Sequence, residues 1–316
     1  MEKIKIKMMC NWMSGKELCE YWNKLTDGNY TYSKNNKEIK IFGEDLSCDD
    51  ADYIIVINNS NDYIYNEKNL YKTIFAKMEP IFLSDFWKHI DGCFLKAKIV
   101  HGSDDPPTKN VINCNLSEWF ISIPRKELEK SDYSQRKSKE NRISSVISGK
   151  NQDEGQKIRI NFALFAQNYM EWDNFGHNSH SIPWKNYLGS IEQKEKALIP
   201  YKYSFNCENV FINGFVTEKL IDCILCETLC FYYGCPNVTN FINENAFVLL
   251  DLGRENDSCE ERQRLWVKAV EKINDAIKNN LWEKRLPNIK AEKKRILLET
   301  SMFPTIFNLI HTDIQQ

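Results

Sequence analysis

The sequence lacks any apolar run near the length of about 20 residues that a membrane-spanning helix needs. Its first residues, MEKIKIKMMCNW, alternate charged and apolar side chains where a secretory signal peptide would need an apolar core. We therefore expect a protein without a transmembrane segment, located in the cytoplasm.

An excess of positive charge is missing as well. The 316 residues carry a net charge of −2, so no general electrostatic field draws the chain to nucleic acid or anionic lipid. We predict no nucleic-acid partner. The hydrophobic content of 42% and charged content of 27% are normal for a globular protein, and the length suffices for two domains.

The cysteines do not indicate a disulfide framework, because their number is 11 and the expected compartment is reducing. Four of them, at positions 223, 226, 230 and 235, are dense enough to suggest a zinc or iron–sulfur site. However, the first two fall inside a predicted helix, the third in the next strand and the fourth in a turn. We favour small buried side chains, and we predict no metal and no cofactor other than a co-substrate.

The first half of the chain alternates short apolar segments with helical ones. We predict strands over 4–10, 52–58 and 72–78 and a helix over 15–25. The run DYIIVIN is almost continuously apolar, as expected for a strand buried on both faces of a parallel sheet. The pattern predicts an α/β protein whose parallel sheet is covered by helices.

A charged stretch without apolar periodicity, residues 129–141, marks a domain boundary. Beyond it we predict strands at 143–148 and from 201, and helices over 158–169, 191–199, 260–279, 289–300 and 303–310. The two βα halves suggest two Rossmann-like domains that face each other across a cleft. We assign 1–140 to the first domain and 141–299 to the second, and the tail 300–316 is a candidate addition to the first.

Polar residues gather where a parallel sheet binds ligands, at strand ends and the helix starts that follow them. Glu208 and Asn209 end the strand from Tyr201, and Thr217, Glu218 and Lys219 open the next helix. A cation in a first helical turn opposes the helix dipole, unless a phosphate sits at the helix start. The alternative is an exposed Lys219 that pairs with Asp222 or Glu218.

Arg159 opens the helix predicted over 158–169, which repeats this unusual placement of a cation. Two cations from separate βα units could bind a diphosphate from both sides, and arginine can do so with two parallel hydrogen bonds. Taken together, Arg159 and Lys219 favour diphosphate binding.

Residues 171–189 form an aromatic-rich segment that we predict to be an irregular loop. Asp173, His177 and His180 could touch a nucleotide or acceptor there, and Trp172 and Trp184 could stack on a base or a sugar. The same residues could equally form the small core of an ordinary loop.

Residues 201–250 resemble the donor-binding motif of the inverting α1,3/1,4-fucosyltransferases, glycosyltransferase family ten. The matching elements keep the order and spacing of that family; they are Tyr201-Lys202-Tyr203, Cys207-Glu208-Asn209, Gly214-Phe215-Val216-Thr217-Glu218-Lys219, Tyr233-Gly234-Cys235-Pro236-Asn237 and Phe247-Val248. Weaker matches are Arg159-Ile160-Asn161-Phe162 and Asn11-Trp12. About a third of the chain carries clear similarity.

The resemblance implies a GT-B architecture, with the nucleotide sugar in the C-terminal domain and the acceptor glycan in the N-terminal one. By position, Arg159 and Lys219 would hold the diphosphate, and Asn209 would reach the phosphate region. Glu218 would contact the sugar or ribose and assist catalysis, and Phe215 would line the donor site. Glu79 would be the general base, although Met78 and Pro80 replace the glycine and asparagine that flank the base in that family.

The resemblance therefore implies a metal-independent enzyme that transfers fucose from GDP-fucose to a glycan hydroxyl, with inversion, in protein or other glycosylation. One alternative is the same chemistry with another nucleotide-linked deoxyhexose. Another is a carbohydrate-binding protein that has the transferase fold but no turnover, and a third is a cysteine–metal regulatory module.

Overall fold

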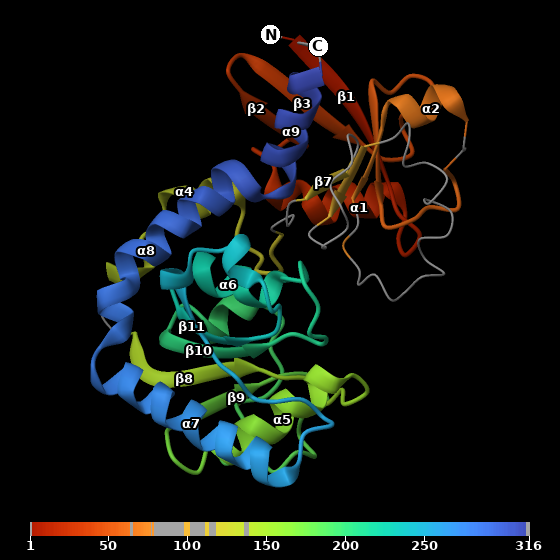
Figure 1. Cartoon of the computed structure of the whole chain (residues 1–316). Coiled ribbons are helices and arrows are strands. Elements are labelled where there is room, and N and C mark those ends of the chain that lie inside the picture. Colours follow the sequence, from red (N-terminus) through yellow and green to blue (C-terminus); the bar gives the residue numbers. More distant parts are fainter. Residues whose placement is uncertain are drawn as a thin grey trace.

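Two lobes, each built on a β-sheet, make up the molecule, and the long C-terminal helices run along one side of both (Figure 1). The structure is a computed structural model that describes residues 2–63, 66–76, 78, 98–101, 111–113, 118–135 and 139–313. The two chain termini lie close together at the outer end of the first lobe (Figure 1).

The sheet of the first lobe has, within the described part of the chain, seven strands in the order β2-β3-β1-β4-β5-β6-β7. Their bounds are β1 (Glu2–Met9), β2 (Thr31–Lys34), β3 (Lys37–Phe42), β4 (Tyr53–Ile57), β5 (Thr73–Ala76), β6 (Lys98–His101) and β7 (Val111–Asn113). Neighbouring strands are parallel except β2 and β3, which form an antiparallel hairpin. The strands predicted at 4–10, 52–58 and 72–78 are thus confirmed as β1, β4 and β5.

The hairpin is a feature that the sequence analysis did not predict. Its turn residues Asn35 and Asn36 have φ angles of 51° and 60°. A two-residue hairpin turn needs this left-handed conformation at both positions, and asparagine tolerates it better than most residues. The hairpin places β3 on one side of β1 and β4 on the other, so the first sheet changes winding direction at β1.

The sheet of the second lobe has five parallel strands in the order β12-β11-β10-β8-β9 among the described residues. Their bounds are β8 (Glu140–Val146), β9 (Trp172–Phe175), β10 (Tyr201–Cys207), β11 (Leu229–Tyr233) and β12 (Phe247–Leu249). Because β9 and β10 flank β8, the winding direction changes at β8, and a crevice is expected at the carboxyl ends of β8 and β10. Two sheets of parallel strands covered by helices confirm the predicted α/β class.

The described helices cover these sheets on both faces. They are α1 (Gly15–Trp22), α2 (Glu67–Tyr71), α4 (Arg125–Lys130), α5 (Glu154–Ala166), α6 (Glu218–Leu225), α7 (Cys259–Lys278), α8 (Leu281–Arg295) and α9 (Met302–Asp313). Shorter 3₁₀ turns lie at Asn23–Leu25, Tyr133–Gln135, Lys194–Ala197, Val238–Asn240 and Glu244–Ala246. The helix predicted over 191–199 is therefore wrong, since only the turn Lys194–Ala197 forms there.

The C-terminal helices connect the two lobes. α8 was predicted to begin at Ile289 but begins at Leu281, with Pro287 inside it, and it continues as a π-helical turn over Ile296–Thr300. α9 then returns to the first lobe, where the Phe307 ring lies 5.6 Å from that of Tyr32 on β2. The domain limits at 140/141 and 299/300 stay a prediction.

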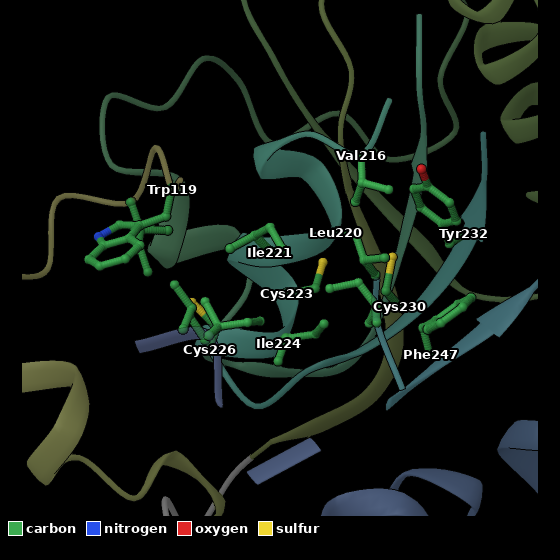
Figure 2. Close-up of a cluster of buried hydrophobic side chains, with 14 of the residues drawn as sticks. Trp119, Val216, Leu220, Ile221, Cys223, Ile224, Cys226, Cys230, Tyr232 and Phe247 are labelled. Carbon is green, nitrogen blue, oxygen red and sulfur yellow. The ribbon is translucent and has the colours of Figure 1, made fainter. Parts of the chain in front are cut away.

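α6 is buried along most of its length in the second lobe. Thr217 caps its first turn, accepting a hydrogen bond from the Lys219 N–H. Leu220, Ile221 and Ile224 are fully buried together with β11 and β12 (Figure 2). Burial of such side chains stabilises the fold by about 1.5–3 kcal/mol each, so the start of α6 is fixed on a firm core.

Candidate donor-binding site

The candidate site lies where β10 ends and α6 begins. Glu208 follows β10 directly and is fully buried. Its carboxylate accepts hydrogen bonds from the Thr217 N–H at 2.9 Å, the Thr217 hydroxyl at 2.7 Å and the Tyr232 hydroxyl at 3.3 Å. These bonds join the N-cap of α6 to the end of β10.

The side chain of Lys219, in the first turn of α6, contacts both Glu208 and Thr217. Its Nζ atom lies 3.3 Å from a carboxylate oxygen of Glu208, 3.3 Å from one of Glu218 and 3.0 Å from the Thr217 hydroxyl. Burial alone lowers the pKa of Lys219, but the charges of Glu208 and Glu218 outweigh it and raise the pKa above its ordinary value. Lys219 is thus a fixed, protonated cation, and its predicted alternative partner Glu218 is one of its contacts.

Arg159 does not open a helix, contrary to the sequence prediction. α5 begins at Glu154 with Asp153 as its N-cap, because Asp153 and Gln156 form a capping box in the polar loop. Arg159 therefore lies in the second turn of α5, where the helix dipole gives little reason for anion binding. Its significance comes from its side chain instead.

The Arg159 side chain is buried and points to the end of β10. Its Nη1 donates to the Asn209 Oδ1 at 2.8 Å and approaches the Cys207 carbonyl at 3.4 Å. Its Nε is buried and has no hydrogen-bond partner among the described residues. Burial lowers the pKa of Arg159, yet arginine stays charged in proteins. Arg159 therefore keeps donor capacity at this site.

The two predicted cations meet at one point of the sheet. Arg159 contacts the residues on both sides of Glu208, and Lys219 pairs with Glu208 itself. Arg159 is close enough for its like charge to oppose in part the raised pKa of Lys219. The two cations thus lie together at the end of β10, next to the point where the winding direction of the sheet changes.

The remaining predicted donor residues lie around these cations. Asn209 is half-buried, and its carbonyl accepts from the Gly155 N–H at 2.9 Å. Phe215 is half-buried in the loop before α6. Burial raises the pKa of Glu218, but Lys219 and Lys194 outweigh burial and lower the pKa below its ordinary value. Glu218 is therefore ionised.

The sequence analysis did not predict the contacts of two buried carboxylates, Glu208 and Asp222. Glu208 was predicted as a strand-end residue within the donor-binding motif, but no role was assigned to it, although it organises the start of α6. Asp222 is fully buried, and its carboxylate pairs with the Lys194 Nζ at 2.7 Å and accepts the Phe120 N–H at 2.9 Å. For Asp222 the available signal was a carboxylate between apolar residues in the sequence, Ile221 and Cys223.

Some expected site residues lie elsewhere or outside the described residues. Glu79, the predicted general base, falls outside the described residues. Residues 172–175 are not loop but strand β9, and Asp173 accepts from the Tyr201 hydroxyl at 2.9 Å. His177 and His180 are exposed.

The rest of the aromatic segment covers the edge of β9 by main-chain hydrogen bonds of Asn174 with Asn186 and Leu188. Trp172 and Trp184 donate to Ser145 and Ser179, at 2.9 and 3.0 Å. These observations favour the alternative of a local core over ligand stacking.

The four clustered cysteines pack into the core around α6 (Figure 2 labels three of them). All four are buried, as predicted: Cys223 lies in α6, Cys230 in β11 and Cys235 in the following turn, while Cys226, which was predicted inside the helix, is its C-cap. Burial raises the pKa of Cys226 and Cys230 well above the ordinary value. Within the described residues, no group of three or more histidine, cysteine or acidic side chains is placed to hold a metal.

Among the described residues, every helix is too short or too polar to cross a membrane.

Comparisons with known proteins give a consistent picture. A segment of 65 residues, 20% of this chain, is 37% identical to the α-(1,3)-fucosyltransferase FucT of Helicobacter pylori. That segment spans 14% of the curated relative's length. No family model matches the chain.

Solved structures match over nearly the whole chain. A crystal structure of an α1,3-fucosyltransferase with GDP-fucose covers 96% of this chain and 93% of its own, at 16% identity and a TM-score of 0.52. A glycosyltransferase from Rickettsia africae ESF-5 covers 100% and 99%, at 10% identity and a TM-score of 0.55. WaaG, a glycosyltransferase involved in lipopolysaccharide biosynthesis, covers 98% and 99%, at 8% identity and a TM-score of 0.50.

The fold is GT-B. The chain also resembles the α1,3-fucosyltransferases both in one sequence segment and in fold, as the motif analysis indicated. The cation pair lies in the second lobe of this fold.

Proposed function

We propose that this protein is a glycosyltransferase that transfers fucose from GDP-fucose to a hydroxyl of a glycan acceptor, with inversion. The observation that carries the proposal is the meeting of Arg159 and Lys219 at the end of β10. It is supported by the similarity to α1,3-fucosyltransferases, one of them solved with GDP-fucose.

The proposed chemistry needs a cationic leaving-group site. As the bond from fucose to the diphosphate breaks, negative charge grows on the phosphate oxygens and positive charge on the sugar. Arg159 and Lys219, already in place, would stabilise the leaving diphosphate without reorganisation, and Asn209 would add a polar contact. With two fixed cations there, the reaction requires no metal ion.

Two carboxylates would serve the sugar side. Glu218 is ionised next to Lys219, and it would contact the ribose or steady the positive charge on the sugar. Glu79 would take the proton from the acceptor hydroxyl, an expectation that rests on the resemblance alone. Phe215 would line the donor site.

Thermal stabilisation by nucleotide sugars tests the proposal. At a concentration of about 100 times Kd, a ligand of the native state adds about 2.7 kcal/mol, which raises Tm by about 4 °C for a chain of this length. We expect the largest rise with GDP-fucose among GDP-fucose, GDP-mannose and UDP-glucose. The largest rise with a different sugar nucleotide would overturn GDP-fucose as the donor.

Turnover separates the enzyme from a carbohydrate-binding protein of the same fold. GDP release in the presence of glycan acceptors is expected in the wild type and is reduced about 100-fold or more in Glu79→Gln, while that variant keeps its thermal response to GDP-fucose. Unchanged turnover in Glu79→Gln would exclude Glu79 as the base. Binding of GDP-fucose without any turnover would favour the binding protein.

A further inference from the structure

Glu208 is a buried charge that the proposed chemistry does not use. It is fully buried directly behind the two cations. A carboxylate taken out of water is tolerated only where donors surround it. Here the Thr217 N–H, the Thr217 and Tyr232 hydroxyls and the Lys219 ammonium supply those donors.

The position of Glu208 is set independently of Lys219. A Cβ atom on Gly155, at the start of α5, would overlap the Glu208 carbonyl oxygen. A Cβ atom on Gly234, in the turn after β11, would overlap the Glu208 side chain and the Tyr232 hydroxyl. Two glycines therefore let the neighbouring backbones close around Glu208, which becomes a rigid anchor.

Lys219, by contrast, is a long side chain that would be free without this anchor. Lysine loses more rotamer entropy on ordering than most residues, and a ligand that has to order it binds less tightly. The Lys219 Nζ is held by Glu208 at 3.3 Å and by Thr217 at 3.0 Å before any ligand arrives. Arg159 is held at the residues on both sides of Glu208.

We propose that Glu208 is a positioning residue, which fixes the ammonium of Lys219 beside Arg159 so that the pair receives a diphosphate in its final geometry. The inference rests on the proposed function for the identity of the ligand. It assigns Glu208 no contact with the substrate.

A purely electrostatic role for Glu208 gives the opposite expectation. Arg159 and Lys219 are balanced by Glu208 and Glu218, so the described charges at the site sum to about zero. Glu208→Gln would leave one net positive charge, which by itself attracts a diphosphate more strongly. The positioning role predicts weaker binding in the same variant, because the ammonium is no longer anchored.

The experiment is a double-mutant cycle in binding, with GDP, UDP and inorganic pyrophosphate as probes and calorimetry as the readout. For whichever of these three probes binds the wild type, we expect two increases in Kd. The increase is about tenfold in Glu208→Gln and about 10–100-fold in Lys219→Met. In the double variant, Kd should equal that of Lys219→Met within about twofold, because Glu208 acts through Lys219. Lys157→Met, which removes a cation of α5 that pairs with Glu255 at 2.7 Å rather than with Glu208, is the matched control and should bind as the wild type does.

Equal or tighter binding by Glu208→Gln, or effects that multiply in the double variant, would overturn the positioning role. If Glu208→Gln fails to fold, Glu208→Asp answers the same question, because it keeps the charge but withdraws it by one methylene. Positioning predicts about tenfold weaker binding by Glu208→Asp, and a pure charge role predicts no change. Binding of UDP or pyrophosphate but not GDP would reject the proposed donor while leaving the cycle valid.

Discussion

At the scale of single residues, the candidate site is built from charges that neutralise each other inside the protein. Arg159, Lys219, Glu208 and Glu218 all lie within one cluster, and each charge has an opposite neighbour or a polar one. Such an arrangement can exist without ligand and still offer donors to one, because the arginine keeps an unpaired N–H among the described contacts. Preorganised donors of this kind account for much of the stabilisation of leaving groups in enzymes.

Removal of either cation should weaken GDP binding. We expect Arg159→Met and Lys219→Met each to raise the Kd for GDP about 10–100-fold, since a hydrogen bond to a charged group contributes about 1.5–3 kcal/mol. Lys157→Met is the matched control, because Lys157 lies on the same helix as Arg159 but pairs with Glu255 at 2.7 Å. Titration calorimetry measures the three values, and an effect of Lys157→Met as large as the others would contradict the assignment.

A second prediction concerns Lys139, which is buried at the end of α6. Its Nζ donates to the carbonyls of Tyr201 and Cys226 at 3.0 and 3.1 Å, and burial lowers its pKa to about 8. The folded protein then releases this proton at lower pH than the unfolded chain, whose lysine pKa is about 10.4. Stability of the wild type relative to Lys139→Met should therefore rise between about pH 8 and 10, by about 1–3 kcal/mol.

Urea unfolding at pH 7 and 9.5, with reductant present, measures this difference. If the free energies of unfolding of the wild type and Lys139→Met differ by the same amount at both pH values, Lys139 keeps an ordinary pKa and the prediction is wrong.

At the scale of elements, the site depends on the packing of α6 as much as on its polar residues. Leu220 is fully buried one position after Lys219. We expect Leu220→Ala to destabilise the protein by about 2–5 kcal/mol, because the shorter side chain leaves a cavity in the closely packed core. Leu188→Ala is the control, since Leu188 is 48% exposed and should change stability by less than about 0.5 kcal/mol.

Chemical denaturation of both variants checks the prediction, and similar stability losses would contradict it.

The elements show how far sequence reasoning could go. β4 and β5 are mostly apolar runs, whereas β1 and β10 alternate polar and apolar residues over most of their length, and both patterns predict strands. The β2–β3 hairpin was missed because its strands are short and polar, with only Tyr32, Ile39 and Ile41 buried. The start of α5 was placed too late because glycine and polar residues were read as loop, whereas Asp153 and Gln156 make that stretch a capping box.

The same holds for the site. Lys219 at the start of α6 follows from local signals, since a threonine N-cap and an apolar helical face fix the helix in the sequence. The contacts of Arg159 with Cys207 and Asn209 join residues about 50 positions apart, and no local pattern encodes such a pairing. For the same reason the roles of Glu208 and Asp222 became visible only in three dimensions.

At the scale of the whole molecule, one buried carboxylate, that of Asp222, connects α6 to residues outside the second sheet. Asp222 on α6 accepts the main-chain N–H of Phe120 in the segment between the lobes, and it pairs with Lys194. The Phe120 ring lies 5.9 Å from that of Tyr21 on α1, in the first lobe. The helix that carries Lys219 is thus connected to both lobes.

Loss of the ion pair between Asp222 and Lys194 should lower the free energy of unfolding. Asp222→Asn leaves the Lys194 ammonium without its counter-charge, and breaking a buried pair in this way costs about 3–5 kcal/mol. We expect a lower free energy of unfolding and faster hydrogen exchange at the Phe120 amide. The double variant Asp222→Asn with Lys194→Met should recover part of the stability, and no recovery would contradict the pairing.

The central claim is that a diphosphate binds between Arg159 and Lys219 at the end of β10. A crystal structure of the protein with GDP bound tests it most directly. We predict phosphate oxygens within about 3.2 Å of the Arg159 guanidinium and of the Lys219 ammonium. A diphosphate bound elsewhere, or a GDP whose phosphates contact neither cation, would contradict the account.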